Sequence, residues 1–272
     1  MNRIPRVVHY CWFGGNPLGE REQVCIDSWK KFLPSYEIKR WDESNWNVRC
    51  CDYVSEAYDA KQWAFVSDYA RLDILYRYGG LYFDTDVELL KSIDDIIERG
   101  PFMGFESDFS ARDEGSVNPG LGFGTYPGLQ LVKDIIDTYE GTHFVNMDGT
   151  YDQTTIVVRT TNALVDHGLR QMPGMQKVDG IWLYPSEYFN PKEFRTGEVH
   201  FTVNARSIHH FSMSWHSPLE KETHAIQNAL LKRGIEGRRA ELLAKILASV
   251  KQRDLSYFKR KVQKSRHDGG VH

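Results

Sequence analysis

The residues Leu81-Tyr82-Phe83-Asp84-Thr85-Asp86-Val87-Glu88-Leu89-Leu90 form an apolar and aromatic run with two carboxylates in its middle. Such a run predicts a β-strand. Asp84 and Asp86 stand at positions i and i+2, so on an extended chain their side chains point to the same face. Two like charges so close repel each other unless a cation lies between them, and carboxylate oxygens suit Mg²⁺ or Mn²⁺. The stretch therefore predicts a divalent-metal site where a strand ends or kinks.

The clearest helix is predicted directly before this strand, over residues 61–79, with the pair Gly79-Gly80 as its C-cap. Asp68 and Arg71 lie three residues apart on one face of this helix. They can form a surface ion pair worth a few tenths of a kcal/mol. Because the helix leads straight into the carboxylate strand, the pair can also lie close to Asp84 and Asp86.

The chain opens with a β-rich run over residues 3–12 that Gly14-Gly15 ends. A helix over 20–33 and a strand over 36–42 follow, and this alternation is typical of α/β proteins that bind nucleotides at the first strand. Trp12 stands where that strand ends, so it can stack on a base or belong to the core. His9 is interpreted as a hydrogen-bonded core or loop histidine.

Two later segments add polar groups. Residues 117–124 form a strand interrupted by glycines, which allow a backbone to approach a ligand closely. Residues 207–215 hold His209, His210, Ser214 and Trp215. Adjacent residues on a strand point in opposite directions, so at most one of the two histidines can join a metal shell. Two structural histidines are the alternative.

Charge is distributed unevenly along the 272 residues, whose net charge is −3. Residues 221–272 carry 13 Lys and Arg against 5 Asp and Glu, whereas residues 1–220 carry 21 against 32. An acidic body argues against nucleic acid as a partner of the whole chain. The basic helical segment can lie on an anionic membrane surface or pack on the domain with a solvated basic face.

The four cysteines contain no CxxC pair, so buried thiols are expected rather than zinc. No run of the sequence is long and apolar enough to predict a membrane-spanning helix. The first residues lack an apolar signal segment, so a cytoplasmic protein is expected.

Several motifs in fixed order resemble one family. They are Ile4-Pro5-x-x-x-His9-x-x-Trp12-x-Gly14-Gly15, Ser67-Asp68-Tyr69-Ala70-Arg71, Tyr78-Gly79-Gly80-Leu81-Tyr82 and Asp84-Thr85-Asp86. Together they resemble the sugar-nucleotide transferases that carry a DXD motif. The narrower resemblance is to the group with yeast-type initiating α-1,6-mannosyltransferases, bacterial capsule and lipopolysaccharide transferases, and the catalytic domains of clostridial glucosylating toxins. It is close over residues 4 to about 90 and weaker around 209–215.

The resemblance implies a GT-A fold, with a Rossmann-like central mixed sheet and flanking helices over residues 1–218 and a basic helical extension over 219–272. It also implies a retaining, metal-dependent transferase. For the nucleotide and the sugar, it implies that Trp12 stacks on the uracil, that Tyr82 lines the nucleotide pocket, that Asp68 and Arg71 bind the donor sugar and ribose, and that Asn118 lies near the donor sugar. For the metal, it implies that Asp86 binds Mn²⁺ or Mg²⁺, that Asp84 contacts the ribose and a metal-bound water, and that His209 or His210 is a third metal contact. Ser214 and Trp215 are implied to bind the diphosphate. Asp152 is the carboxylate expected on the acceptor side.

The expected function is transfer of a sugar from a UDP-sugar to a saccharide or lipid-linked saccharide acceptor in bacterial capsule, lipopolysaccharide or exopolysaccharide synthesis. The basic segment would hold the protein on the inner face of the membrane. A phosphohydrolase with Asp84 as nucleophile and Asp86 as acid is the alternative, but it wants Thr or Gly-Thr soon after the second Asp, where Val87-Glu88 stand. A nucleotide-sugar binding module without turnover is a third interpretation.

Overall fold

The computed structural model describes residues 3–111, 113–193, 197–212, 218–235 and 237–251. The chain divides into two compact units, one of residues 1–192 and 200–210 and the other of residues 193–199 and 211–272. The boundary expected after residue 218 lies within the second unit and stays a prediction.

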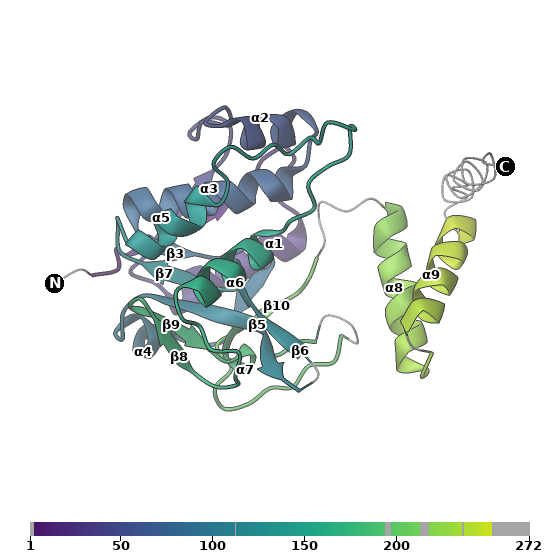
Figure 1. Ribbon diagram of the computed structural model, residues 1–272. Helices are drawn as coiled ribbons and strands as arrows, with labels where there is room; N and C mark the ends of the chain where they lie inside the picture. Colours follow the sequence, from purple (N-terminus) through teal and green to yellow (C-terminus); the bar gives the residue numbers. More distant parts are fainter. Residues whose placement is uncertain (1–2, 112, 194–196, 213–217, 236, 252–272) are drawn as a thin grey trace. The chain divides into compact units, whose positions relative to one another are not determined.

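The first unit is built on an eight-stranded mixed sheet among the described residues, in the order β2-β1-β3-β7-β5-β9-β8, with β6 paired to β5 (Figure 1). Strands β2, β1 and β3 run parallel, and β7 pairs with both β3 and β5 in the antiparallel sense. The strands are β1 Val7–Cys11, β2 Glu37–Trp41, β3 Gly80–Tyr82, β5 Phe102–Ser110, β6 Asp113–Asn118, β7 Phe123–Thr125, β8 Gln176–Val178 and β9 Ile181–Tyr184.

A separate two-stranded sheet pairs β4, Val87–Leu89, with β10, Ser207–His209. The single strand predicted over 81–90 is therefore wrong, because Phe83–Asp86 form a turn between β3 and β4. Two side chains of helix α1, Glu20–Phe32, hold β4 in place. Trp29 Nε1 donates to Val87 O at 2.8 Å, and Leu89 N donates to Ser28 Oγ at 2.9 Å.

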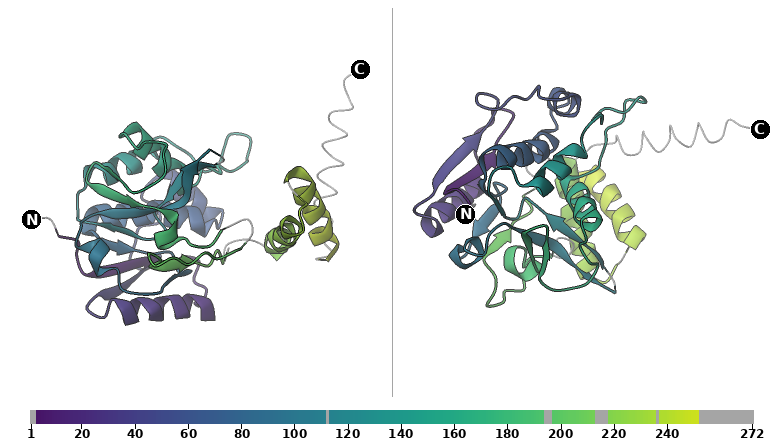
Figure 2. Two further views of the ribbon diagram at one scale, coloured as in Figure 1. Left: turned by 90° about the horizontal axis from the view of Figure 1, so that it is seen from below. Right: turned by 60° about the vertical axis from the view of Figure 1, so that its left-hand side comes forward.

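Helices cover both faces of the central sheet. Helix α1 packs on one face, and α3, α5 and α6 lie on the other (Figure 2). The alternation of side chains along a strand explains this division, since Leu81 and Phe83 join the core under α1 while Tyr82 joins the core under α3. The helices of this unit are α1 Glu20–Phe32, α2 Asp52–Asp59, α3 Trp63–Tyr78, α4 Asp94–Ile97, α5 Gln130–Asp137, α6 Ile156–Asp166 and α7 Ser186–Phe189.

The predicted class, a Rossmann-like mixed sheet with flanking helices, is confirmed, as are the first strand, the helix over 20–33, the strand over 36–42 and the helix before the DXD stretch. Helix α3 ends where Gly79 N donates to Leu75 O at 2.8 Å. Cys11 and Cys25 are buried thiols, as expected, whereas Cys50 and Cys51 are only half-buried.

The second unit contains two helices among its described residues, α8 Pro218–Lys232 and α9 Gly237–Lys251, which pack against each other. Small residues at a spacing of four, Ala240, Ala244 and Ala248, are fully buried. Four larger apolar side chains of α9 are exposed: Leu242, Leu243, Leu247 and Val250. In the part of the chain that the structure describes, no helix has the length and apolar character needed to cross a membrane.

Candidate active site

The DXD residues lie in the turn that leads from β3 to β4. Phe83 N donates to His9 O at 3.3 Å, and Asp84 N donates to Gly120 O at 2.8 Å. Val87 N donates to Asp84 O at 3.0 Å and closes the turn. The backbone of the motif is thus held by β1, by the segment after β6, and by its own turn, so the two carboxylates start from fixed positions.

Asp84 meets a guanidinium from α3 rather than standing as a bare carboxylate. Arg71 Nη2 lies 3.1 Å from Asp84 Oδ1, and Arg71 Nη1 lies 3.2 Å from Asp84 Oδ2. The same Nη2 is 2.8 Å from Asp68 Oδ1, one helical turn away. The side chain of Arg71 is only 5% exposed, so this is a buried network and not the surface ion pair considered as the alternative. The structure therefore brings Asp68 and Arg71 to the DXD turn.

Asp68 connects this network to another helix. Its Oδ2 accepts from Ile156 N, the first residue of α6, at 3.3 Å. Burial raises the pKa of the Asp68 carboxyl to about 6, against the opposing effect of Arg71. With one oxygen on Arg71 and the other on a helix N-terminus, Asp68 is arranged to hold protein groups in place.

Gly120 is required by the close approach of its backbone to the Arg71–Asp84 pair. A Cβ atom at position 120 would lie 1.8 Å from Asp84 Oδ2 and 2.6 Å from Arg71 Nη1. Gly120 N also donates to Asn118 Oδ1 at 2.7 Å. The glycine-rich segment predicted to approach a ligand thus approaches the DXD carboxylate itself.

The two histidines diverge, as their adjacent positions predict. His209 Nε2 lies 3.1 Å from Asp86 Oδ1, and His210 Nε2 lies 2.8 Å from Glu88 Oε2. His210 N donates to Asp86 O at 2.9 Å, which ties the residue after β10 to the DXD turn. Of the two candidate metal contacts, His209 is therefore the one placed beside Asp86.

Negative charge surrounds the His209 imidazole. Burial lowers its pKa, but the carboxylates of Asp86, Asp84 and Glu106 outweigh that effect and leave the pKa above its usual value. Asp86 and His209 thus place a carboxylate and an imidazole side by side, two side chains of the kinds that ligate divalent cations.

Glu106 was not singled out from the sequence, although it lies in this acidic group. It is on β5, and its Oε2 accepts from Asn118 Nδ2 at 2.6 Å. Asn118 is buried and also bonds Gly120, so its amide is used to position other groups. Asn118, which was predicted to lie near the donor sugar, thus holds the carboxylate of Glu106 in place. The sequence around Glu106 has no motif that would predict its place at the site.

Trp12 follows directly after β1, as expected. Trp12 N donates to Trp41 O at 2.9 Å and the indole Nε1 donates to Asn16 O at 2.7 Å. Its ring is half-buried, with one part packed on the core below α1. An anchored, partly exposed indole at the carboxyl end of a central strand is suited to stacking on a base.

Tyr82 lies deeper than its predicted place in the pocket lining. It is 1% exposed, and the Arg71 guanidinium lies 4.9 Å from the centre of its ring. Its position beneath the cation means that Tyr82 supports Arg71 from the core.

His9 is a core residue, as interpreted from the sequence. Trp41 Nε1 donates to its Nδ1 at 3.0 Å, so its Nε2 carries the proton and donates to Gly79 O at 2.9 Å.

Asp152, expected on the acceptor side, forms an ion pair instead. Arg159 Nη2 lies 2.8 Å from Asp152 Oδ2, and Thr154 N donates to Asp152 Oδ1 at 2.8 Å. Arg159 also donates to Thr138 O at 2.7 Å. Asp152 is thus placed to stabilise the loop before α6, and a catalytic role for it stays a prediction.

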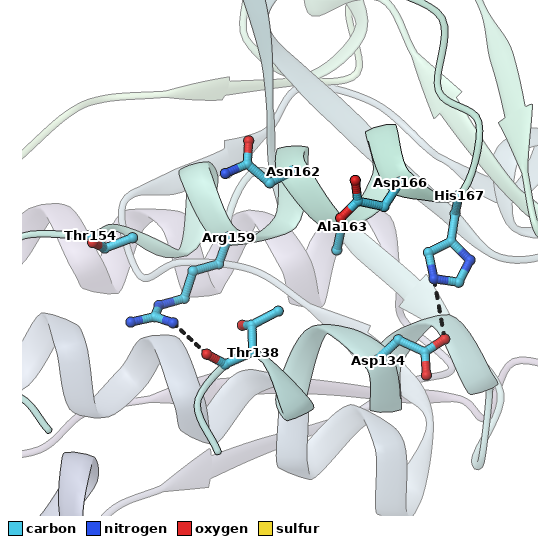
Figure 3. Close-up of a pocket in the computed structure, with 8 residues that line it drawn as sticks. All are labelled: Asp134, Thr138, Thr154, Arg159, Asn162, Ala163, Asp166 and His167. Atoms are coloured by element: carbon cyan, nitrogen blue, oxygen red, sulfur yellow. Dashed lines mark hydrogen bonds and ion pairs between the residues drawn. The ribbon is translucent and has the colours of Figure 1, made fainter. Parts of the chain in front are cut away.

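A cavity of about 290 Å³ lies between α5 and α6, beside Arg159 (Figure 3). Its lining residues include Asp134, which lies 3.4 Å from His167 Nε2, and they do not include Asp84 or Asp86. The polar turn around the DXD motif, and not this cavity, holds the groups suited to the chemistry. Ser214 and Trp215, predicted to bind a diphosphate, lie outside the described residues.

Asp86 and His209 alone cannot complete the shell of a metal ion, so the fit depends on ligands from outside the protein. Within the described ranges, no group of three or more His, Cys, Asp and Glu side chains is arranged to hold a metal ion. Asp86 and His209 supply two donors, while Asp84 is engaged by Arg71. Mg²⁺ commonly takes one or two carboxylates and completes its shell with water and substrate phosphates, and Mn²⁺ accepts the same oxygen ligands. The residues fit such an ion, completed by a phosphate.

Comparisons with known proteins agree with the motifs. Residues 19–103 match the model of a family described as "Glycosyltransferase sugar-binding region containing DXD motif". Inositol phosphoceramide mannosyltransferase 3 of Schizosaccharomyces pombe is 25% identical over 207 residues, covering 72% of this chain and 54% of that protein. Inositol phosphoceramide mannosyltransferase 1 of the same organism is 26% identical over 117 residues, covering 38% and 34%. The chain thus spans between a third and about half of these relatives.

Among solved structures, one described as "PaToxG Glycosyltransferase" covers 60% of this chain and 69% of its own, with 16% identity and a TM-score of 0.43. The resemblance to DXD-motif glycosyltransferases is confirmed by the family match over residues 19–103 and by the two mannosyltransferase relatives.

Proposed function

From the DXD sugar-binding region in residues 19–103, we propose that this chain transfers a sugar from a nucleoside-diphosphate sugar to a saccharide or lipid-linked saccharide. The observation that supports the proposal most is the meeting of two charged pairs on one short turn, Asp84 with Arg71 and Asp86 with His209. A donor of this kind carries a sugar, a diphosphate and a base, and the turn has groups suited to the first two.

Mn²⁺ or Mg²⁺ would be held by Asp86 and His209, with Asp84 nearby. When bound, the ion supplies positive charge for the diphosphate as it leaves the sugar. The remaining roles belong to side chains. Trp12 would stack on the base, proposed to be uracil. Arg71 would keep Asp84 in position for the ribose, since a guanidinium stays charged and its fork matches a carboxylate.

The reaction is proposed to retain the anomeric configuration. Asp84 is paired with Arg71, which disfavours it as a covalent nucleophile and disfavours the phosphohydrolase alternative too. The acceptor hydroxyl would attack from the face that the diphosphate leaves, so the bond from sugar to diphosphate breaks as the bond to the acceptor oxygen forms. The acceptor proton would pass to the departing phosphate oxygen.

For the acceptor, we propose a lipid-linked saccharide at the cytoplasmic face of a membrane. The names of the two relatives include an inositol phosphoceramide, which supports a lipid-bound acceptor. Both relatives are from yeast, so transfer in bacterial capsule, lipopolysaccharide or exopolysaccharide synthesis stays a prediction. They are named mannosyltransferases, so GDP-mannose belongs in the donor panel beside the predicted UDP-sugars.

The exposed side chains of α9 support peripheral binding to an anionic membrane. Leu243, Leu247 and Val250 recur on one side of the helix and are 40%, 47% and 63% exposed. Basic residues accompany them, including Arg239 and Lys251. Apolar side chains with flanking cations suit the interface of an anionic bilayer. Binding to vesicles with and without phosphatidylserine tests this, and a triple Leu243→Ser, Leu247→Ser, Val250→Ser variant should bind less.

One assay tests the function. The protein is incubated with Mn²⁺ and UDP- or GDP-sugars, and release of nucleoside diphosphate is followed. Slow hydrolysis of one donor, lost in Asp86→Ala, is the expected result. Release of phosphate from a phosphomonoester, without turnover of any donor, would instead identify a phosphohydrolase. Tight binding of a donor with no turnover, with or without saccharide acceptors, would identify a binding module.

A further inference from the structure

Lys192 is a cation at the DXD turn that the motifs do not include. It follows Pro191 in the segment after α7, and its Nζ donates to His210 O at 2.8 Å. The N–H of the same residue, His210, donates to Asp86 O at 2.9 Å. His210, the residue directly after β10, therefore connects the backbone of Asp86 to the ammonium of Lys192.

Lys192 is one of two cations near this part of the turn. Burial and the nearby Arg21 lower the pKa of the Lys192 ammonium, while Asp86 raises it. Arg21 lies in the first turn of α1, the helix that packs against β4. Lys192 and Arg21 therefore bring positive charge to the part of the turn that carries Asp86, and an ammonium or guanidinium there can form a charge-assisted hydrogen bond with a phosphate.

We propose that Lys192 binds the diphosphate of the nucleotide-sugar donor, on the side of Asp86 that faces the His210 carbonyl. This inference rests on the proposed function, because it assigns a residue to the leaving group of that reaction. An ammonium is a compact charge with three N–H donors, so its charge acts on a phosphate while the bond to His210 O persists.

The chemistry requires such a group. Negative charge grows on the diphosphate as its bond to the sugar breaks, and a positive charge held in place stabilises that change. Lys192 would stay protonated throughout and would take no proton from the acceptor. Lys192 would thus add its charge to whatever stabilisation the residues around Asp86 provide.

Nucleotide binding tests the inference without turnover. Calorimetry with Mn²⁺ present measures the dissociation constants of UDP and GDP for the full chain, and NMR titration measures those of uridine and guanosine. Lys192→Met keeps the length of the side chain and removes its charge. It should weaken binding of the preferred diphosphate by about ten- to a hundredfold, the range for a hydrogen bond to a charged group. Binding of the matching nucleoside should not change.

Two further variants separate charge from architecture. Lys192→Arg keeps the positive charge and should recover most of the diphosphate affinity. Lys91 provides a matched control, because its ammonium also donates to a loop carbonyl, that of Val203. Lys91→Met should bind the diphosphate like the wild type.

Unchanged diphosphate affinity in Lys192→Met would overturn the inference. An equal loss for the diphosphate and the nucleoside would also overturn it, because it would mean that Lys192 only supports the turn. If the wild type bound neither UDP nor GDP, the proposed function itself would fail, and that result is distinct from both others.

Discussion

Arg71 of α3 and Asp84 in the turn after β3 form a bidentate ion pair, with N–O distances of 3.1 and 3.2 Å. The helix and the strand are separated only by Gly79, whose turn brings position 71 back beside position 84. The first aspartate of the motif is therefore oriented by the preceding helix, and only the second, Asp86, faces the histidine. This relationship leaves Asp86 as the carboxylate that is proposed to hold the metal, while Asp84 is paired with Arg71.

Removal of the guanidinium should destabilise the fold strongly. Arg71→Met would leave Asp68 and Asp84 without their buried partner, and breaking a buried pair costs about 3–5 kcal/mol. Urea denaturation measures the free energy of unfolding. Arg77→Met is the control on the same helix: Arg77 pairs with Asp73 at 2.7 Å, but its side chain is 57% exposed. That change should cost about 1 kcal/mol or less. Equal costs would contradict the buried network.

Gly120→Ala should displace the carboxylate of Asp84. The new methyl group would overlap Asp84 Oδ2 and Arg71 Nη1, whose positions are fixed by each other. We expect a loss of about 1–3 kcal/mol in stability, typical of overpacking, together with weaker nucleotide binding. Gly19→Ala is the comparison, because its Cβ would meet only the end of the flexible Glu22 side chain. A Gly120→Ala protein with unchanged nucleotide affinity would show that the placement of Asp84 does not matter for the donor.

Metal binding should depend on one histidine of the pair. His209→Gln removes the imidazole beside Asp86, and we expect about a ten- to hundredfold loss of Mn²⁺ affinity, measured by electron paramagnetic resonance with UDP present. His210→Gln alters a side chain that faces Glu88 and should bind Mn²⁺ nearly as the wild type does. The reverse order of effects would exclude Asp86–His209 as the metal pair.

Much of the first half of the fold could be predicted because its signals are local. The periodic apolar positions of α3, its glycine C-cap and the spacing of Asp68 and Arg71 all lie within one helix and its end. The break of residues 81–90 could not be predicted, because β4 leaves the central sheet to pair with β10, and Asp86 and His209 are 123 residues apart.

The missed residues share a physical cause. Glu106 and Lys192 reach the DXD turn through Asn118 and through the His210 carbonyl, and such tertiary contacts have no spacing along the chain. The depth of Tyr82 could not be predicted either, because strand alternation gives the face of a residue and not what covers it. In α9, likewise, the apolar stripe of the sequence does not tell which side chains the helix packing buries, and the alanines are buried while Leu242, Leu243 and Leu247 are exposed.

Acid should destabilise the protein through His9. Burial lowers its pKa from 6.5 to about 4, so the folded state binds fewer protons than the unfolded state between these values. The stabilisation is present above pH 6.5 and is lost as the pH falls through about 4, by about 3 kcal/mol in total. NMR titration of the His9 ring checks the pKa, and urea denaturation from pH 7 to 4 checks the slope. An imidazole that titrates near 6.5 would contradict this account.

Glu106→Gln should lower turnover more than binding. Glutamine keeps an oxygen that accepts from Asn118 Nδ2, so the hydrogen bond at 2.6 Å can persist while the charge disappears. Breaking the bond from sugar to diphosphate leaves positive charge on the sugar ring, and a fixed carboxylate stabilises it. We therefore expect donor hydrolysis to slow by about ten- to a hundredfold with little change in UDP affinity.

Asp108 offers a matched control two residues along β5, where its carboxylate accepts from Ser186 N and Oγ at 3.1 and 2.6 Å. Asp108→Asn should hydrolyse the donor at the wild-type rate, and an equal loss in both variants would mean that β5 only supports the site.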